Sequence, residues 1–191
     1  MARKNATCLA VLLVLGVAGC GGGQAKADPL SVEEHLTLGA AYEAQEMRSR
    51  AGKEYGAALR LDPKSIAALI ALGNLAFQDM NLVEAEIYYR KALKLEPKHV
   101  GANNNLATVF VLRGTRLNLA EHLAKTALEA AGPYRSYVLD TLANVYMRQG
   151  RIAEAKVALD EAERGVHPKN TLLRAHIAQS RRQLETYGRL Q

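Results

Sequence analysis

The sequence predicts an all-α protein made of stacked helix pairs, on three observations. The first is its composition: Ala and Leu recur throughout, aromatic residues make up only 5%, and Trp is absent. Such a composition favours closely packed helices over sheets, in which β-branched and aromatic residues are enriched. The other two observations are a repeat of residue types at a fixed spacing and helix-end signals in the same register. With 191 residues, 49% of them hydrophobic, the chain is long enough to bury a core.

The repeat has a spacing of 34 residues and continues through most of the chain. Matching positions in the first two units are Leu38-Gly39 and Leu72-Gly73, Ala51 and Ala85, Tyr55 and Tyr89, Ala58 and Ala92, and Pro63 and Pro97. A third unit begins at Val100 and a fourth at Ser136, and the third has one extra residue near its inter-helix turn. Two positions are Ala in every unit: Ala51, Ala58, Ala85, Ala92, Ala120, Ala127, Ala155 and Ala162. We expect helices to approach most closely at these positions, where only a small side chain fits.

This pattern of Leu-Gly, Tyr, Ala, Ala and Pro resembles the tetratricopeptide repeat. The resemblance implies a right-handed solenoid of about four helix pairs over residues 31–168, in units 32–65, 66–99, 100–134 and 136–168. It also implies a concave groove, lined mainly by the first helix of each pair, that binds a peptide or a partner helix. A solenoid needs a polar-faced terminal cap, and residues 169–191 are predicted to form this C-terminal capping helix.

Helix-end signals agree with this register. Ser31 stands three residues before Glu34, the spacing of a capping box, at the start of the first helix. Gly114 and Gly150 close the first helices of units three and four, where the backbone turns left-handed. Units one and two have no Gly at this turn, so we expect the segment 45–49 to be less regular.

The N-terminal segment is predicted to direct secretion and to attach the chain to a membrane. Residues 1–19 have a basic start, an apolar run and then small residues, which is the layout of a secretory signal peptide. The sequence at 17–20, Val-Ala-Gly-Cys, resembles the lipobox of bacterial lipoproteins, which implies cleavage before Cys20 and lipidation of its thiol. Residues 20–30 then form the lipidated Cys and a flexible, Gly-rich tether. The alternative is an ordinary cleaved signal peptide with an incidental cysteine.

Lipidation of Cys20 makes the membrane one expected partner of the chain, because stable anchoring takes at least two lipid chains and a lipobox cysteine carries them. The expected location is the bacterial cell envelope, lipid-anchored and facing the periplasm. Gly21, rather than Asp, follows the cysteine. In enteric-type bacteria this favours the outer membrane over the inner membrane.

Charge and side-chain chemistry argue against several function classes. Removing the basic residues of the signal peptide lowers the net charge from +6 to +4, and there is no basic stripe with interleaved aromatics, so nucleic acid is not an expected partner. The five histidines are scattered, without Cys or acidic residues at metal-ligand spacing, and each is expected to be solvated. We therefore expect no catalytic residues, no metal site and no cofactor, and not an enzyme.

The predicted groove contains several side-chain amides. Three consecutive Asn residues at 103–105 are unfavourable in a helix, which indicates that their side chains have another role. Amides donate and accept together, so they could hold the backbone of an extended peptide; the alternative is that they are only solvated. The candidate groove residues are Asn74, Phe77, Asn104, Asn105, Thr108, Tyr137, Asp140, Asn144 and Arg148. Asn74 and Asn105 match the two Asn places of the family's two-carboxylate clamp, but the cationic places carry no basic residue, which weakens a prediction of carboxylate capture.

The expected function is a membrane-anchored scaffold for protein–protein interactions in the bacterial cell envelope. Two narrower alternatives stay open. One is an assembly factor for a type IV pilus or secretin system, although the lipoproteins of that kind carry more than four repeats. The other is an adaptor that recruits cell-wall hydrolases.

Overall fold

The computed structural model describes residues 28–189; the predicted signal peptide, Cys20 and most of the tether lie outside this range. The described chain contains nine α-helices, one 3₁₀ turn and no strand. The helices are α1 (Val32–Ala44), α2 (Arg48–Leu61), α3 (Ile66–Gln78), α4 (Leu82–Leu95), α5 (Val100–Arg113), α6 (Leu117–Glu129), α7 (Arg135–Arg148), α8 (Ile152–Gly165) and α9 (Thr171–Arg189), with the 3₁₀ turn at Gly132–Tyr134.

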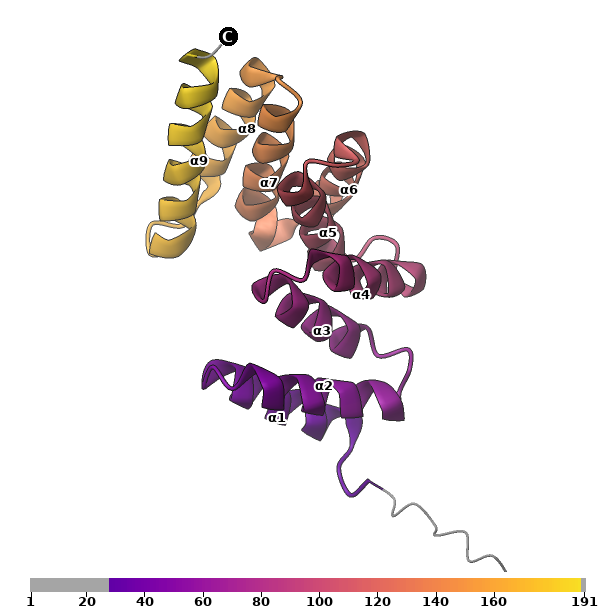
Figure 1. Cartoon of the computed structure of the whole chain (residues 1–191). Helices are drawn as coiled ribbons and strands as arrows, with labels where there is room; N and C mark the ends of the chain where they lie inside the picture. The colour runs from indigo at the N-terminus through magenta and orange to yellow at the C-terminus, as the bar shows by residue number, and fades with distance from the viewer. Residues whose placement is uncertain (1–27, 190–191) are drawn as a thin grey trace, which may run out of the picture.

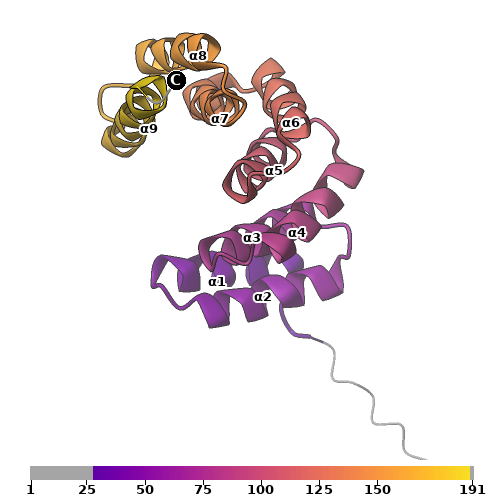
Figure 2. The same ribbon diagram turned by 45° about the horizontal axis from the view of Figure 1, so that its top comes forward.

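Consecutive helices form pairs, and the pairs stack into a curved, all-helical solenoid from α1 at one end to α9 at the other (Figure 1). The second helix of each pair also contacts the first helix of the next pair. First helices contact one another across units, α3 with α5, α5 with α7 and α7 with α9 (Figure 2). This confirms the all-α fold and the solenoid of the tetratricopeptide type. The last helix, α9, occupies the place that the first helix of a fifth pair would have.

The repeated alanines are fully buried in this stack, as their expected place at helix–helix contacts requires. All eight are 0% exposed: Ala51, Ala58, Ala85, Ala92, Ala120, Ala127, Ala155 and Ala162. The repeated Gly has a related reason, because a Cβ on Gly73 would lie 2.6 Å from Cε1 of Tyr89. A larger side chain at any of these positions would push the helices apart. The extra residue of unit three is absorbed before Leu117, so its alanines stay in register.

The turns between paired helices are more regular than expected. The fifteenth residue of each unit has a left-handed backbone, with φ of 59° at Glu46, 59° at Met80, 61° at Gly114 and 76° at Gly150. The residue that follows then donates its N–H to the carbonyl five positions back, as Met47 does to Tyr42 at 2.8 Å. The expectation of an irregular segment 45–49 is therefore wrong, because these hydrogen bonds hold the turn even without Gly.

Ser31 forms the predicted capping box. Its hydroxyl accepts from the N–H of Glu34 at 3.2 Å, and the Glu34 carboxylate accepts from the N–H of Ser31 at 2.8 Å. These bonds satisfy backbone donors that have no partner inside the first turn. The cap fixes where the chain leaves the tether and enters α1.

His35 does not have the solvated environment that the sequence suggested. It is 4% exposed. Its Nδ1 lies 2.7 Å from Oε2 of Glu54, and its Nε2 lies 3.2 Å from Oδ1 of Asp28, an ion-pair distance without hydrogen-bond geometry. The hydrogen bond to Glu54 raises the pKa of His35, against the opposing effect of burial. This histidine joins α1, α2 and the end of the tether.

The left-handed turn predicts that Met80→Gly stabilises the protein. Met80 is largely exposed, so the change removes little packing, while it relieves a backbone conformation that costs a non-Gly residue about 1–2 kcal/mol. Gly also increases the conformational entropy of the unfolded chain, which offsets part of this effect. The expected increase in the free energy of unfolding is therefore about 0.5–1 kcal/mol. Urea unfolding would measure it. Met80→Ala, which keeps the strained φ, is the matched control; equal stability of the Gly and Ala variants would contradict the explanation.

His35 predicts a pH-dependent part of the stability. Because its pKa is raised on folding, its contribution is fully present below the unfolded pKa of about 6.5 and is lost as the pH rises through the folded pKa. The free energy of unfolding that His35→Gln removes should therefore be larger at pH 6 than at pH 9, as determined by urea unfolding at both values. A pH-independent difference would rule out the charged pairing with Glu54 and Asp28.

Candidate functional site

The concave face carries a central hollow of about 660 Å³ between α5, α7 and α9. Seven of the nine predicted groove residues line it: Phe77, Asn104, Asn105, Thr108, Tyr137, Asp140 and Asn144. They come from three consecutive first helices, whose inner faces the stack places side by side. The repeat register thus brings together residues that lie as far apart in the sequence as Phe77 and Asn144.

The wall made by α9 was missed by the sequence analysis, which assigned this helix only a capping role. Six of its residues line the central hollow: Leu172, Leu173, His176, Gln179, Ser180 and Gln183. The repeat register points to four of them, because Leu172, His176, Gln179 and Gln183 are residues 2, 6, 9 and 13 counted from Thr171, and groove residues of this repeat family occupy these positions in the first helix of a unit. The predicted polar face of α9 is partly engaged, because Arg181 bonds Asp160 and Glu163 of α8, both at 2.7 Å.

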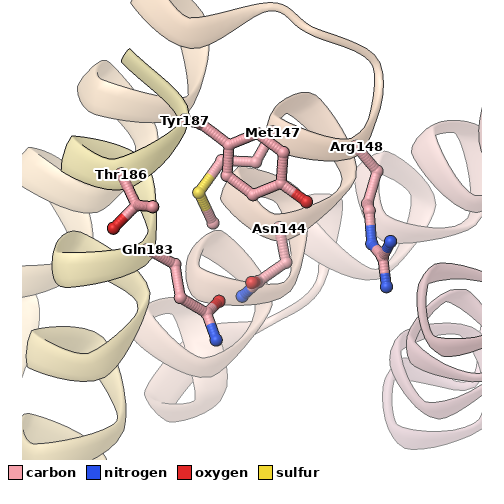
Figure 3. Close-up of a pocket in the computed structure, with 6 residues that line it drawn as sticks. All are labelled: Asn144, Met147, Arg148, Gln183, Thr186 and Tyr187. Atoms are coloured by element: carbon pink, nitrogen blue, oxygen red, sulfur yellow. The ribbon is translucent and has the colours of Figure 1, made fainter. Parts of the chain in front are cut away.

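Two further hollows continue the central one. A smaller hollow of about 290 Å³ lies between α7 and α9 and shares Asn144 and Gln183 with it. Figure 3 shows Gln183 and Tyr187 of α9 facing Asn144 and Met147 of α7, with Arg148 on the side away from α9. On the other side, a hollow of about 690 Å³ next to the 3₁₀ turn shares Asn104, Asn105 and Tyr137. The three hollows together are called the groove below.

Asn74 lies beside the central hollow and not among its lining residues. Its Oδ1 accepts from the hydroxyl of Tyr89 at 2.8 Å and from Nδ2 of Asn105 at 3.0 Å. Burial raises the pKa of Tyr89, so this hydroxyl stays a donor at every physiological pH. Asn74 therefore connects the core of unit two to the groove residue Asn105.

The three consecutive asparagines have different roles. Asn103 is buried, and its Nδ2 donates to the carbonyls of Pro97 and His99 at 2.9 and 3.0 Å, which fixes the loop before α5. Asn105 donates to Asn74. Asn104 faces the groove with a buried Oδ1 that has no hydrogen-bond partner. The unfavourable run is thus explained by two structural contacts and one open acceptor.

Asn144 connects α7 to α9. Its Nδ2 donates to the carbonyl of Asp140 at 2.8 Å and to Oγ of Ser180 at 3.2 Å. This amide therefore has its donors engaged within the protein, and the bond to Ser180 holds α9 against the groove. Asn144 lines both the central hollow and the smaller hollow between α7 and α9.

Asp140 and His176 are the acidic and basic groups of the central hollow. Asp140 is only 3% exposed, and its Oδ2 lies 2.7 Å from Nδ1 of His176, while its Oδ1 has no hydrogen-bond partner. The hydrogen bond to Asp140 raises the pKa of His176, against a smaller effect of burial. His176 is exposed, as expected for a solvated histidine, but the sequence did not predict its pairing with Asp140.

Over residues 28–189 there is no group of three or more His, Cys, Asp or Glu that could hold a metal ion. In the same part of the chain, no helix is long and apolar enough to cross a membrane.

The comparisons with known proteins agree with this architecture. A model of the tetratricopeptide repeat matches residues 66–99, the second of the predicted units. Among curated proteins, the chain is similar to the probable UDP-N-acetylglucosamine–peptide N-acetylglucosaminyltransferase SPINDLY of Hordeum vulgare, 33% identical over 93 residues. The SPINDLY protein of Petunia hybrida is 37% identical over 83 residues. These matches cover 49% and 44% of this chain but only 10% and 9% of the plant proteins.

Solved structures share the fold over most of the chain. A structure from the functional characterisation of Pseudomonas aeruginosa pilF has a TM-score of 0.66 and 24% identity, covering 82% of this chain and 72% of that one. MamA has a TM-score of 0.64 at 22% identity, covering 73% and 81%. A thermophilic tetratricopeptide repeat protein of Thermus thermophilus has a TM-score of 0.64 at 19% identity, covering 80% and 82%. With the repeat match, these likenesses show a tetratricopeptide-type solenoid.

Proposed function

We propose that this protein is an interaction scaffold that binds a peptide or partner helix in its concave groove. The observation that carries the proposal is the central hollow, which opens between three helices and continues at both sides. Proteins of this fold generally bind other proteins. A site that extends over several units suits an elongated segment better than a compact small molecule.

The groove has the composition of a protein-binding surface. Exposed apolar side chains surround it, with Leu172 84% exposed, Leu112 44% and Tyr137 42%. Between them lie polar groups that can fix the register of a bound chain, including Asn104 and Asp140. Apolar and aromatic anchors beside a few placed polar groups are the usual combination at a protein interface.

We further propose that the scaffold is held at a membrane through lipidated Cys20. This rests on the sequence alone: the apolar run, the lipobox-like residues 17–20 and the Gly-rich tether. The expected site is the periplasmic side of the bacterial envelope, with the outer membrane favoured. The described chain enters the solenoid at α1, at the opposite end from α7 and α9 (Figure 1). Such an anchor would attach the solenoid to the membrane at the end opposite α7 and α9.

The pilus or secretin assembly factor and the cell-wall hydrolase adaptor remain narrower forms of this proposal. The likeness to the pilF structure, at 24% identity, concerns the fold and does not identify a partner. Neighbouring genes would distinguish the two, since pilus or secretin genes favour the first and hydrolase genes the second.

The groove proposal predicts that apolar side chains of its wall contribute directly to binding. A phage-displayed library of random dodecapeptides, selected on the full chain, supplies the probe peptides. Replacing Leu112 and Leu172 together with Ser should weaken the selected peptides at least about tenfold, because each buried Leu contributes about 1.5–3 kcal/mol. Fluorescence anisotropy would measure Kd.

The matched control for this change is Val83 and Val157 together replaced with Ser. These side chains are 60% and 63% exposed and do not line the groove, so the control carries the same polarity change on other surfaces. If both double variants weakened peptide binding equally, or if neither weakened it, binding in the groove would be contradicted. Charge reversal of Arg181 is less suitable as a control, because this residue holds α9 to α8.

The anchoring proposal predicts that Cys20→Ser releases the protein from the membrane fraction or leaves it uncleaved, with an unchanged fold. Ser cannot accept the thioether-linked lipid. Mass spectrometry of the wild-type protein should find acyl chains on an N-terminal Cys20. A mature N-terminus at any other residue, or one without acyl mass, would overturn the lipoprotein proposal.

A further inference from the structure

The central hollow contains two buried hydrogen-bond acceptors that have no partner. Among residues 28–189, three buried side-chain nitrogen or oxygen atoms lack a hydrogen-bond partner, and two of them are oxygens of residues that line this hollow: Oδ1 of Asn104 and Oδ1 of Asp140. The Asn144 amide donates two hydrogen bonds within the protein, and the Asn105 amide donates one. A buried acceptor without a donor costs free energy, so the hollow is best completed by a ligand that donates.

The two acceptors have equivalent places in neighbouring units. Asn104 is the fifth residue counted from Val100, and Asp140 is the fifth counted from Ser136. They therefore lie on the inner faces of α5 and α7, which contact each other. An ammonium or a guanidinium carries several donors, and the residues of both acceptors line the same hollow.

The charge of Asp140 is poorly compensated within the protein. No Lys or Arg is among the described residues that line the central hollow, and His176 is the one basic side chain there. A buried carboxylate with a single partner is unfavourable unless a cation approaches it. The side chain of His176 is 64% exposed, so it can leave without disturbing the core, whereas Asp140 is held inside α7.

We propose that the groove binds a lysine or arginine side chain of its partner, with the cationic head at Asp140 in exchange for His176 and with Asn104 as the second acceptor. The proposal rests on the proposed function and specifies its partner chemistry. Oδ1 of Asp140 is buried without a partner, and Oδ2 pairs with the exposed His176 ring, whose displacement frees this oxygen for the cation. Apolar side chains that line the same hollow, among them Phe77 of α3 and Leu172 of α9, can contact the methylene stem.

The acceptors and the carboxylate of the central hollow also disfavour an anionic ligand. A partner's C-terminal carboxylate would meet the negative charge of Asp140 and two acceptors that it cannot satisfy. Its natural counter-charges are missing from the lining of the central hollow in the described chain. A segment with a cationic residue among apolar ones fits the site better than an acidic segment.

The test uses random dodecapeptides displayed on phage and selected against the full chain. Sequences that bind in the groove, as shown by their loss on the Leu112 and Leu172 variant, should carry Lys or Arg at one aligned position. Asp140→Asn should weaken such a peptide at least about tenfold, because a charge-assisted hydrogen bond is lost. The same peptide with Met in place of its Lys or Arg should bind both proteins alike.

Asn104→Asp is the second variant and keeps the proposal testable if Asp140→Asn folds poorly. A second carboxylate beside the first should tighten the cationic peptide several-fold and leave the Met peptide unchanged. Groove-binding peptides without a common Lys or Arg, or cationic peptides indifferent to both variants, would overturn this inference and leave the scaffold intact. Failure to select any groove-binding peptide would instead count against the proposed function itself.

Discussion

The close approach of helices at the repeated alanines is the constraint on which the rest of the structure depends. Eight methyl groups, all fully buried, set the spacing within and between helix pairs. Because interiors pack densely, one larger residue would displace a whole helix and every unit stacked after it. The inner faces of α3, α5, α7 and α9 are brought side by side by this spacing. All eight alanines belong to the second helices of the pairs, so the groove on the first helices depends on how the second helices pack.

Polar groups of the concave face divide into those that hold the structure and those that remain open. Asn74 accepts hydrogen bonds from Tyr89 and Asn105, and Asn144 donates one to Ser180. The bonds Asn105–Asn74 and Asn144–Ser180 join neighbouring units. Asn104 and Asp140 keep acceptors without donors. The two kinds have similar side chains on the same face of the stack. What separates them is which groups the neighbouring helices bring within hydrogen-bond reach, and this is a property of the stacked units.

Histidine illustrates how the two ends of the solenoid differ. His35 is buried between Glu54 and Asp28 and joins the tether to the first pair, so its pairing concerns stability. His176 is exposed on α9 and pairs with one buried carboxylate of the groove, so its pairing can be exchanged for that of a ligand. Both pKa values are raised by a carboxylate. Because of this difference in exposure, His35 has a structural role, and we propose a functional role for His176.

The sequence by itself determined the fold class, the repeat register and many of the residues that line the concave hollow, because small residues at close contacts and turn residues at helix ends are local requirements of the repeat. The Ser31 cap and the left-handed turn at Gly114 are examples. Only the tertiary structure decided that α9 forms a wall of the groove and which asparagine keeps an open acceptor. Those properties depend on side chains about one repeat apart, such as Asn144 with Ser180 and Asp140 with His176. Their contact follows from the stacking of whole units, which no local pattern encodes.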